Sequence, residues 1–306
     1  MRSLRSSERA RNELMIVAAL VILSIAAFVV GGYFEYIMMY FFAYSVFALS
    51  WDLLYSYSGQ LSLGHAIPFG VGAFMLAILA GMLRLNPLAS FAAASLVAAL
   101  VGGSLGTSTL RLRPAYQGVA LLVLSQVLYW FTLYRFGDEG ISFTLDVPFW
   151  GVYAMGMAAF IMASIIVIYI TNSNIGLRLT AIKDDNAAAM AIGIDVVRYK
   201  VFVQFLSNFI AGLGGSFYVL FTLDANYSVF SITNSFFPIA ISVLGGMGSP
   251  GGVLIGGLLL TALTTFLPAV TSLAASYLIY AVIVFLFLRF YPRGLQNLLS
   301  KVGIKI

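Results

Sequence analysis

Two glycine-rich interruptions in a long apolar sequence hold the residues whose types and spacing suggest chemistry. The first runs from Ser58 to His65 (SGQLSLGH) and the second from Gly245 to Gly252 (GGMGSPGG). Glycine breaks a helix, and irregular backbone at membrane depth is tolerated only where it is buried in protein or lines a wet cavity. Paired interruptions in the two halves of a chain are typical of a transport pathway. The alternative is a pair of ordinary tight turns between helices.

Ionisable residues accompany the first interruption. Asp52 lies in an apolar segment, where an ionisable group costs at least about 2.5 kcal/mol to insert, and His65 is the one histidine of the chain. One interpretation is a cluster that handles substrate or protons. The other is an Asp52 at the membrane interface and a His65 that caps or packs at a helix start. The candidate pathway residues are Asp52, Gly59, Gln60, Ser62, His65, Gly245, Gly246 and Gly248.

The polar connection at residues 172–198 is a second candidate site. Residues 181–192 are rich in strong helix formers, with polar side chains suited to cap a short helix at its start and Gly193 to end it. Such an alanine-rich helix between basic flanks is suited to dock on another protein. A helix lying on the membrane surface is the alternative, but it has few large apolar residues. The candidate docking residues are Asp184, Asp185, Asn186, Ala188, Ala189 and Gly193.

Apolar helices must position both sites. Of the 306 residues, 61% are hydrophobic and 9% charged, whereas soluble domains are about 45–50% apolar and about 25% charged. The apolar runs approach the ~20 residues that cross a bilayer, and the alternation of an outer-membrane barrel is missing. We therefore expect one all-α membrane domain, residues 1–306, with about ten transmembrane helices (8–10). They lie near Leu14–Tyr33, Tyr36–Leu54, Ala66–Leu83, Pro87–Leu110, Gln117–Tyr134, Gly151–Thr171, Tyr199–Phe221, Asn234–Leu244, Gly252–Pro268 and Tyr277–Tyr291.

The basic residues predict the orientation of these helices. With a cytoplasmic N-terminus, all of the 16 Lys and Arg residues except Arg84 and Arg135 fall on the cytoplasmic side, as the positive-inside rule requires. Both termini, the basic residues 1–13 and the 172–198 connection are then cytoplasmic. The net charge of +5 needs no nucleic-acid partner. Small residues four apart (Gly102 and Gly106, Gly212 and Ser216, Gly252 and Gly256) predict close helix packing.

Several kinds of chemistry are excluded by residue type. The chain has no cysteine and one histidine, so thiolate chemistry and a histidine-rich metal centre are excluded. None of the four lysines stands in a phosphate-binding G-x-x-x-x-G-K-[ST] motif. We therefore expect no catalytic residue, metal or cofactor on this chain. If ATP drives the protein, another subunit must hydrolyse it.

These segments together resemble the LivM-type permease of branched-chain amino acid ABC importers. The matching stretches, in family order, are residues 58–66, 69–73, 110–113, 182–185, 188–189, 193–194, 198–200, 211–215, 244–249, 289 and 292–295. The resemblance implies the LivM/LivH permease fold, import of leucine, isoleucine and valine, and a coupling role for residues 184–193. It implies as partners two ATPase subunits that bind ATP and Mg, a second permease of the LivH type or a second copy, and an extracytoplasmic substrate-binding protein.

Other functions remain open from the sequence. Urea and short-amide importers share the same permease motifs, so the solute is less well defined than the fold. A self-sufficient secondary transporter or channel using Asp52 and His65 is a different class of function. By resemblance the location is the cytoplasmic (inner) membrane of a prokaryote.

Overall fold

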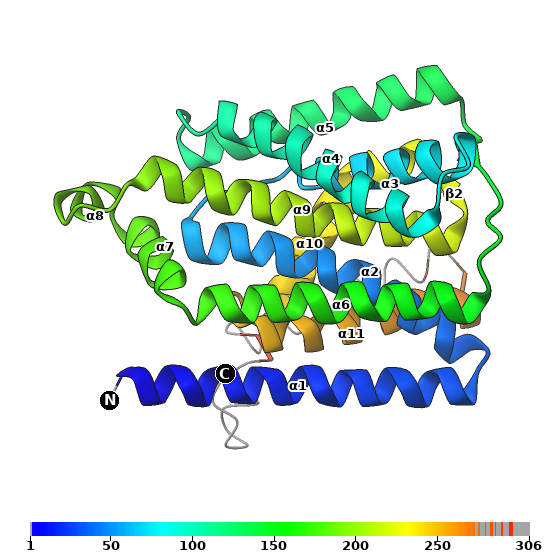
Figure 1. The fold of residues 1–306 in the computed structure, drawn as a ribbon, viewed down its shortest axis with the longest axis horizontal. Coiled ribbons are helices and arrows are strands. Elements are labelled where there is room, and N and C mark those ends of the chain that lie inside the picture. Colours follow the sequence, from blue (N-terminus) through cyan, green and yellow to red (C-terminus); the bar gives the residue numbers. More distant parts are fainter. Residues whose placement is uncertain are drawn as a thin grey trace.

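The computed structural model describes residues 2–272 and the separate positions 275, 279, 282, 283, 285, 289, 294 and 295. The chain is almost entirely helical over these residues (Figure 1). The long helices are α1 (Arg2–Val30), α2 (Tyr33–Asp52), α4 (Pro87–Ser108), α5 (Pro114–Phe136), α6 (Phe149–Thr171), α9 (Val196–Thr222) and α11 (Pro250–Val270). The shorter elements are η1 (Leu53–Tyr57), α3 (Ala66–Leu76), η2 (Ala77–Met82), β1 (Ile141–Ser142), α7 (Asn174–Asp184), α8 (Asn186–Ala191), β2 (Asp224–Ala225), η3 (Tyr227–Phe230) and α10 (Ile232–Gly245).

The expectation of a polytopic helical protein is confirmed. Within the described residues, seven helices are long and apolar enough to cross a membrane, and Ala66–Met82 and Ile232–Gly245 are shorter apolar helices. These nine correspond to the first nine predicted spans, with ends that differ by a few residues except at α1. The tenth, Tyr277–Tyr291, lies almost wholly outside the described residues, so the total and the side on which each terminus lies stay predictions.

Local sequence accounts for many helix starts. Proline opens α4, α5 and α11, where its missing N–H and fixed φ cost nothing. The side chains of Asn86, Ser231 and Ser249 accept backbone N–H bonds at the starts of α4, α10 and α11, as N-caps do.

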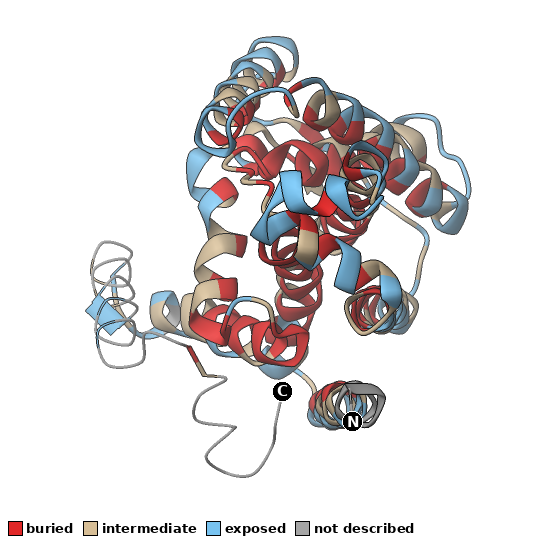
Figure 2. Cartoon of the chain, turned by 90° about the vertical axis from the view of Figure 1, so that its left-hand side faces the viewer, coloured by how far each residue is buried: buried red, intermediate tan, exposed pale blue. Residues whose placement is uncertain are grey.

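The bundle is built around α2, α3 and α9. Almost all of α2 is buried, whereas α1 and α5 expose most of their apolar residues, and Figure 2 shows the buried residues in the middle of the bundle with α1 at its edge. The predicted small-residue contacts are confirmed. A Cβ on Gly212 would lie 2.5 Å from the Cβ of Ala98, and one on Gly106 would lie 1.8 Å from Gln204 Nε2, so these glycines make room for the close packing of α4 and α9.

The structure refines the sequence analysis in three places. α1 begins at Arg2, so the basic residues 2–13 continue the first apolar helix instead of forming a separate segment. The second and third spans end in the π-helical turns η1 and η2, which hydropathy does not reveal. The helix expected at 181–192 is divided between α7 and α8, because Asp185 leaves the helical conformation to cap α8.

The loops gather at two ends of the bundle. α7, α8, the start of α1 and the break between α10 and α11 lie at one end (Figure 1), which we call the α7–α8 end. The turn before α4, the β1–β2 ladder and the start of α10 lie at the other end. Arg84 and Arg135 belong to this second end, as the predicted orientation requires.

Candidate functional site

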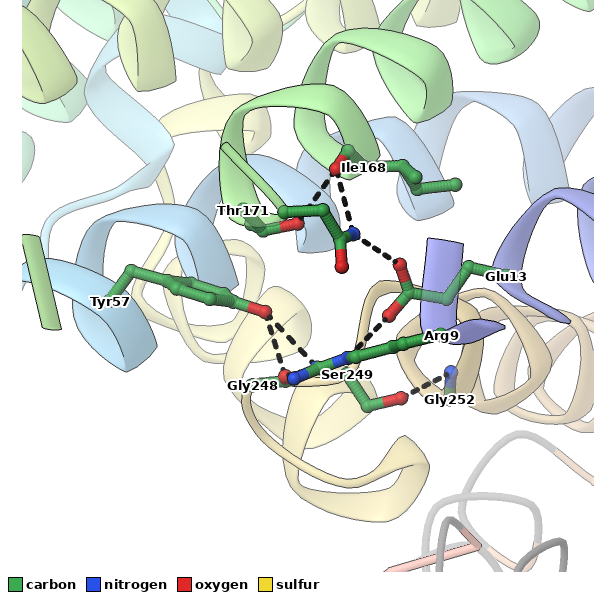
Figure 3. Close-up of polar contacts among 9 residues, drawn as sticks. Arg9, Glu13, Tyr57, Ile168, Thr171, Gly248, Ser249 and Gly252 are labelled. Atoms are coloured by element: carbon green, nitrogen blue, oxygen red, sulfur yellow. Dashed lines mark hydrogen bonds and ion pairs between the residues drawn. The ribbon is translucent and has the colours of Figure 1, made fainter. Parts of the chain in front are cut away.

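The second glycine-rich interruption packs against the helix that precedes the first one. The backbone N–H of Gly248 donates to Asp52 Oδ1 at 3.0 Å. Its carbonyl accepts from Tyr57 Oη at 2.7 Å and from an Arg9 guanidinium nitrogen at 2.6 Å. We call these four residues the Gly248 junction; Figure 3 shows Arg9 and Tyr57 converging on Gly248. Residues far apart in the sequence thus hold both sides of one loop.

Glycine is required in this loop by backbone conformation. Gly246 has φ +108° and Gly248 has φ +80°, a region that only glycine enters freely. Gly245, the last residue of α10, lies so close to α11 that a Cβ would stand 2.3 Å from the Gly252 carbonyl oxygen. The three glycines therefore allow α10 and α11 to turn and touch at once.

Arg9 is itself held by a buried carboxylate. Arg9 Nε lies 3.1 Å from Glu13 Oε1, and Asn172 Nδ2 donates to Glu13 Oε2 at 3.0 Å. The Glu13 side chain is completely buried and that of Arg9 is 37% exposed. Because a buried charge is tolerated only when paired and hydrogen-bonded, this arrangement ties α1 to the end of α6 and aims the guanidinium at Gly248.

The structure places Asp52 inside the bundle, and its depth in the membrane stays a prediction. Its side chain is fully buried, and Oδ1 accepts both the Gly248 N–H and the Ser56 hydroxyl, the latter at 2.6 Å. Among the described residues, Oδ2 has no hydrogen-bond partner. Asp52 therefore bonds two neighbouring backbone turns, η1 and the α10–α11 loop.

The first interruption forms a separate set of contacts. Gln60 Nε2 donates to Ser58 Oγ at 2.9 Å and to the Lys200 carbonyl at 3.2 Å, which ties the segment to the start of α9. The Ser62 carbonyl accepts the indole N–H of Trp51 at 2.8 Å. Gly59, with φ +71°, passes directly beneath the Lys183 side chain.

His65 is packed and hydrogen-bonded at the start of α3. Its Nε2 lies 2.8 Å from Ser50 Oγ, and its ring stacks on Phe47 with centroids 5.5 Å apart. The side chain is buried and makes no capping bond to the helix. The structure thus places His65 in the core of the bundle, away from the Gly248 junction.

The α7–α8 segment divides the predicted docking residues into two groups. Asp185 caps α8 through bonds from the N–H groups of Ala187 and Ala188, at 2.7 and 3.1 Å, and Gly193 follows α8 with φ +83°. Ala189 faces inward with Ile182 and cannot belong to an exposed face. The exposed members are Asp184, Asp185, Asn186, Ala188 and Gly193.

Lys183 links this segment to the Gly248 junction. Its ammonium donates to the Ser56 carbonyl at 2.8 Å, and the Ser56 hydroxyl bonds Asp52. Ser56 therefore connects Lys183 of α7 to Asp52, the side chain that accepts the Gly248 N–H.

Sequence reasoning missed the basic and phenolic partners of the Gly248 junction. The spacing of Arg9 and Glu13, four residues apart in α1, was a signal of their ion pair but not of the burial of Glu13. Tyr57 and Lys183 gave no such signal, because their partners are 191 and 127 residues away. Within the described part of the chain, no group of three or more His, Asp or Glu side chains is placed to hold a metal ion.

Seven helices among the described residues are long and apolar enough to cross a membrane, which defines a polytopic helical membrane protein. The chain belongs to the family described as branched-chain amino acid transport system / permease component, which matches residues 33–288. That family is one of transport-system subunits. No solved structure matches the chain significantly.

Curated relatives carry two kinds of name. The high-affinity branched-chain amino acid transport system permease protein LivM of Salmonella typhimurium is 25% identical over 252 residues, which cover 71% of this chain and 59% of the relative. A probable LivM of Methanocaldococcus jannaschii is 22% identical over 89% of this chain and 82% of its own length. A nucleoside ABC transporter permease protein, NupC of Lactococcus lactis, is 24% identical over 70% of this chain and 77% of its own length. This chain therefore spans about three fifths of the first of these relatives.

Proposed function

We propose that this chain is the membrane permease of an ATP-driven importer for leucine, isoleucine and valine. Its partners would be two ATPase subunits, a second permease and an extracytoplasmic substrate-binding protein, in the inner membrane of a prokaryote. ATP and Mg would bind to the ATPase subunits. Family membership and the LivM names support this solute class.

The observation that carries the proposal is the position of the α7–α8 segment. It extends from the bundle at the α7–α8 end (Figure 1) and exposes apolar side chains, with Met190 58% and Ile192 74% exposed. Beside it lies a cleft of about 660 Å³ whose lining includes Ile192, Arg178 and Arg198. An exposed apolar patch with a charged rim is typical of a protein-binding surface, here for an ATPase subunit.

The contacts behind this surface support a coupling route. A force on α7 reaches the Ser56 carbonyl through Lys183, and Ser56 is bonded to Asp52, which holds the Gly248 N–H. Each link is a hydrogen bond between two elements. A chain of three hydrogen bonds therefore connects α7 to the α10–α11 loop. We assign Gly59 and Gln60 to the same coupling route. Gly59 contacts the Lys183 side chain, and Gln60 donates to the Lys200 carbonyl.

A second candidate solute is a nucleoside, because one relative of similar identity is named as a nucleoside permease. Competition distinguishes the candidates. In cells expressing the whole transporter, unlabelled isoleucine and valine should abolish ATP-dependent uptake of labelled leucine, whereas uridine and urea should not compete. Inhibition by uridine alone would replace the solute class and keep the permease assignment.

The coupling surface is tested by Ala188→Arg, which places a long cation on the exposed side of α8. We expect the variant to lose more than nine tenths of leucine uptake and to co-purify with less ATPase subunit, while the permease remains in the membrane. Asn174→Arg, on the exposed first turn of α7, is the matched control. Normal uptake and normal ATPase recovery in Ala188→Arg would refute the docking role. Purification of the wild-type chain alone, still moving solute after reconstitution, would favour a self-sufficient transporter.

A further inference from the structure

A cavity of about 550 Å³ lies at the end of the bundle opposite α7 and α8. Six aromatic rings line it, and we call it the tyrosine cavity; they belong to Tyr36, Tyr40, Tyr44, Phe69, Tyr218 and Phe237. Its size is that of a small-molecule site, for which about 300–1,000 Å³ is usual. None of the residues discussed so far as candidate pathway residues lines it.

Helix geometry explains why the cavity exists. Tyr36, Tyr40 and Tyr44 are four residues apart, so they share one face of α2, and the rings of Tyr40 and Tyr44 are nearly parallel with centroids 6.3 Å apart. α10 has only 14 residues, about 21 Å at 1.5 Å per residue, against about 30 Å of hydrocarbon. A short α10 beside a tyrosine face leaves space that no helix of residues 2–272 fills.

The residues that line the cavity determine which net charge a bound solute, the guest, can carry. The described residues of the lining include no Asp, Glu, Lys or Arg; their polar groups are tyrosine and small hydroxyls, with the amide of Asn234. A solute with a net charge would lose its hydration there without a counter-ion. An ammonium group can lie over tyrosine faces, a carboxylate can accept from the Ser231 and Thr233 hydroxyls of the lining, and an apolar side chain can pack on the rings. A net-neutral zwitterion with an apolar body meets all three conditions.

Two phenylalanines close the cavity toward the α7–α8 end. Phe69 and Phe47 are completely buried and their ring centroids are 4.4 Å apart. Phe69 stacks under Tyr44, with an interplanar angle of 11°, and Phe47 stacks on His65. The aromatic column therefore runs from the tyrosine cavity to the end of the first glycine-rich interruption.

We propose that the tyrosine cavity is the outward-open binding chamber of the permease for a small, net-neutral amino acid with an apolar side chain, closed below by Phe47 and Phe69. This inference rests on the proposed import function and adds the chamber and its floor. The low polarity of the lining suits transient binding, since a guest held only by ring faces and hydroxyls leaves easily once the floor opens.

The absence of cysteine allows a direct test by single-cysteine labelling of the assembled transporter in right-side-out vesicles. Asn234→Cys and Thr264→Cys place a thiol in the cavity. Ser207→Cys places one below the floor, where Ser207 is buried and bonds the Ser50 carbonyl, and Val123→Cys places one on the exposed face of α5. We expect a membrane-impermeant thiosulfonate reagent to modify only the two cavity thiols, and saturating leucine to slow that modification at least fivefold.

Each other outcome is decisive. Protection by uridine and not by leucine would overturn the amino-acid assignment. Cavity thiols that react without protection, or do not react, in vesicles whose parent protein takes up leucine would overturn the chamber. If Ser207→Cys is modified as fast as the two cavity thiols, Phe47 and Phe69 do not close the cavity. If the cysteine-free protein shows no ATP-dependent leucine uptake, the proposed function fails, and this result is read independently of any labelling.

Discussion

The two ends of α2 belong to regions of opposite character. Near its start, Tyr36, Tyr40 and Tyr44 line an open, uncharged space; near its end, Asp52 and the following η1 turn enter a dense set of charged and backbone hydrogen bonds. In the Gly248 junction almost every polar group has a partner from a distant element. In the tyrosine cavity the bonded hydroxyls, such as those of Tyr36 and Tyr40, pair within the cavity wall, and the ring faces are left for a guest.

This difference supports the proposed division between coupling at one end of α2 and recognition at the other. Hydrogen bonds between distant elements stabilise one conformation, and several of them break at once when one element moves. Such an arrangement suits a change between two conformations. Ring faces around a cavity have little directional demand, which suits a site that must accept and release solutes. Both regions share the buried helix α2, and Phe47 of the proposed floor lies in that helix, so we expect a shift of the Asp52 end to reach the floor of the cavity.

The largest expected effect comes from the backbone of the Gly248 loop. Gly246→Leu should abolish leucine uptake and strongly reduce assembled protein, because the residue is buried and its φ of +108° is closed to side chains. Gly137→Leu is the control at the opposite end. Its φ is also positive, +72°, but nothing lies within 4 Å of an added Cβ, so we expect at most a twofold loss. Equal effects would mean that backbone strain alone matters and that the junction has no special role.

The next effect separates the hydrogen bonds of Asp52 from its charge. Asp52→Leu removes the acceptor for Ser56 and the Gly248 N–H and should lower uptake at least tenfold, because the buried donors are left unpaired. Asn keeps a carbonyl oxygen at the same place, so Asp52→Asn should retain most of the uptake. Complete loss in Asp52→Asn, with normal amounts of complex, would instead assign a proton- or ion-coupling role to the carboxylate.

A smaller effect is expected for the anchor of the junction on α1. Among the described residues, Arg9→Met leaves the buried Glu13 with Asn172 as its one side-chain partner and should destabilise the complex by about 2 kcal/mol, the size of a hydrogen bond to a charged group. The double variant Arg9→Met/Glu13→Gln removes the unpaired charge and should recover at least half of that loss in thermal-unfolding measurements. If the double variant is no more stable than the single one, the ion pair does not hold α1 in place.

How much of this could be predicted from sequence depends on the range of the interaction. Hydropathy located the spans, and the residue types of Asp52, Gly59 and Gly246 identified the broken backbone, because those signals are local. The partners of the Gly248 peptide were not predictable, since Arg9 lies 239 residues away. The tyrosine cavity was hidden for another reason: tyrosines count as apolar in a span, and only the short α10 beside them shows that they face a space.

The smallest expected effect tests the chemistry of that space. Tyr40→Phe removes a hydroxyl that lies 3.0 Å from the Tyr36 hydroxyl but keeps the ring, so we expect the KM for leucine to change less than threefold at unchanged maximal rate. Tyr40→Leu removes the aromatic face and should raise the KM about tenfold if ring faces hold the ammonium, since a cation–π contact of about 1–2 kcal/mol corresponds to roughly five- to thirtyfold in affinity. Tyr134→Leu, on an outward face of α5 where the side chain is 91% exposed, is the matched control and should leave the KM unchanged. A fall in maximal rate with an unchanged KM in Tyr40→Leu would contradict the division between the two regions, because it would give the cavity a part in the conformational change instead of in recognition.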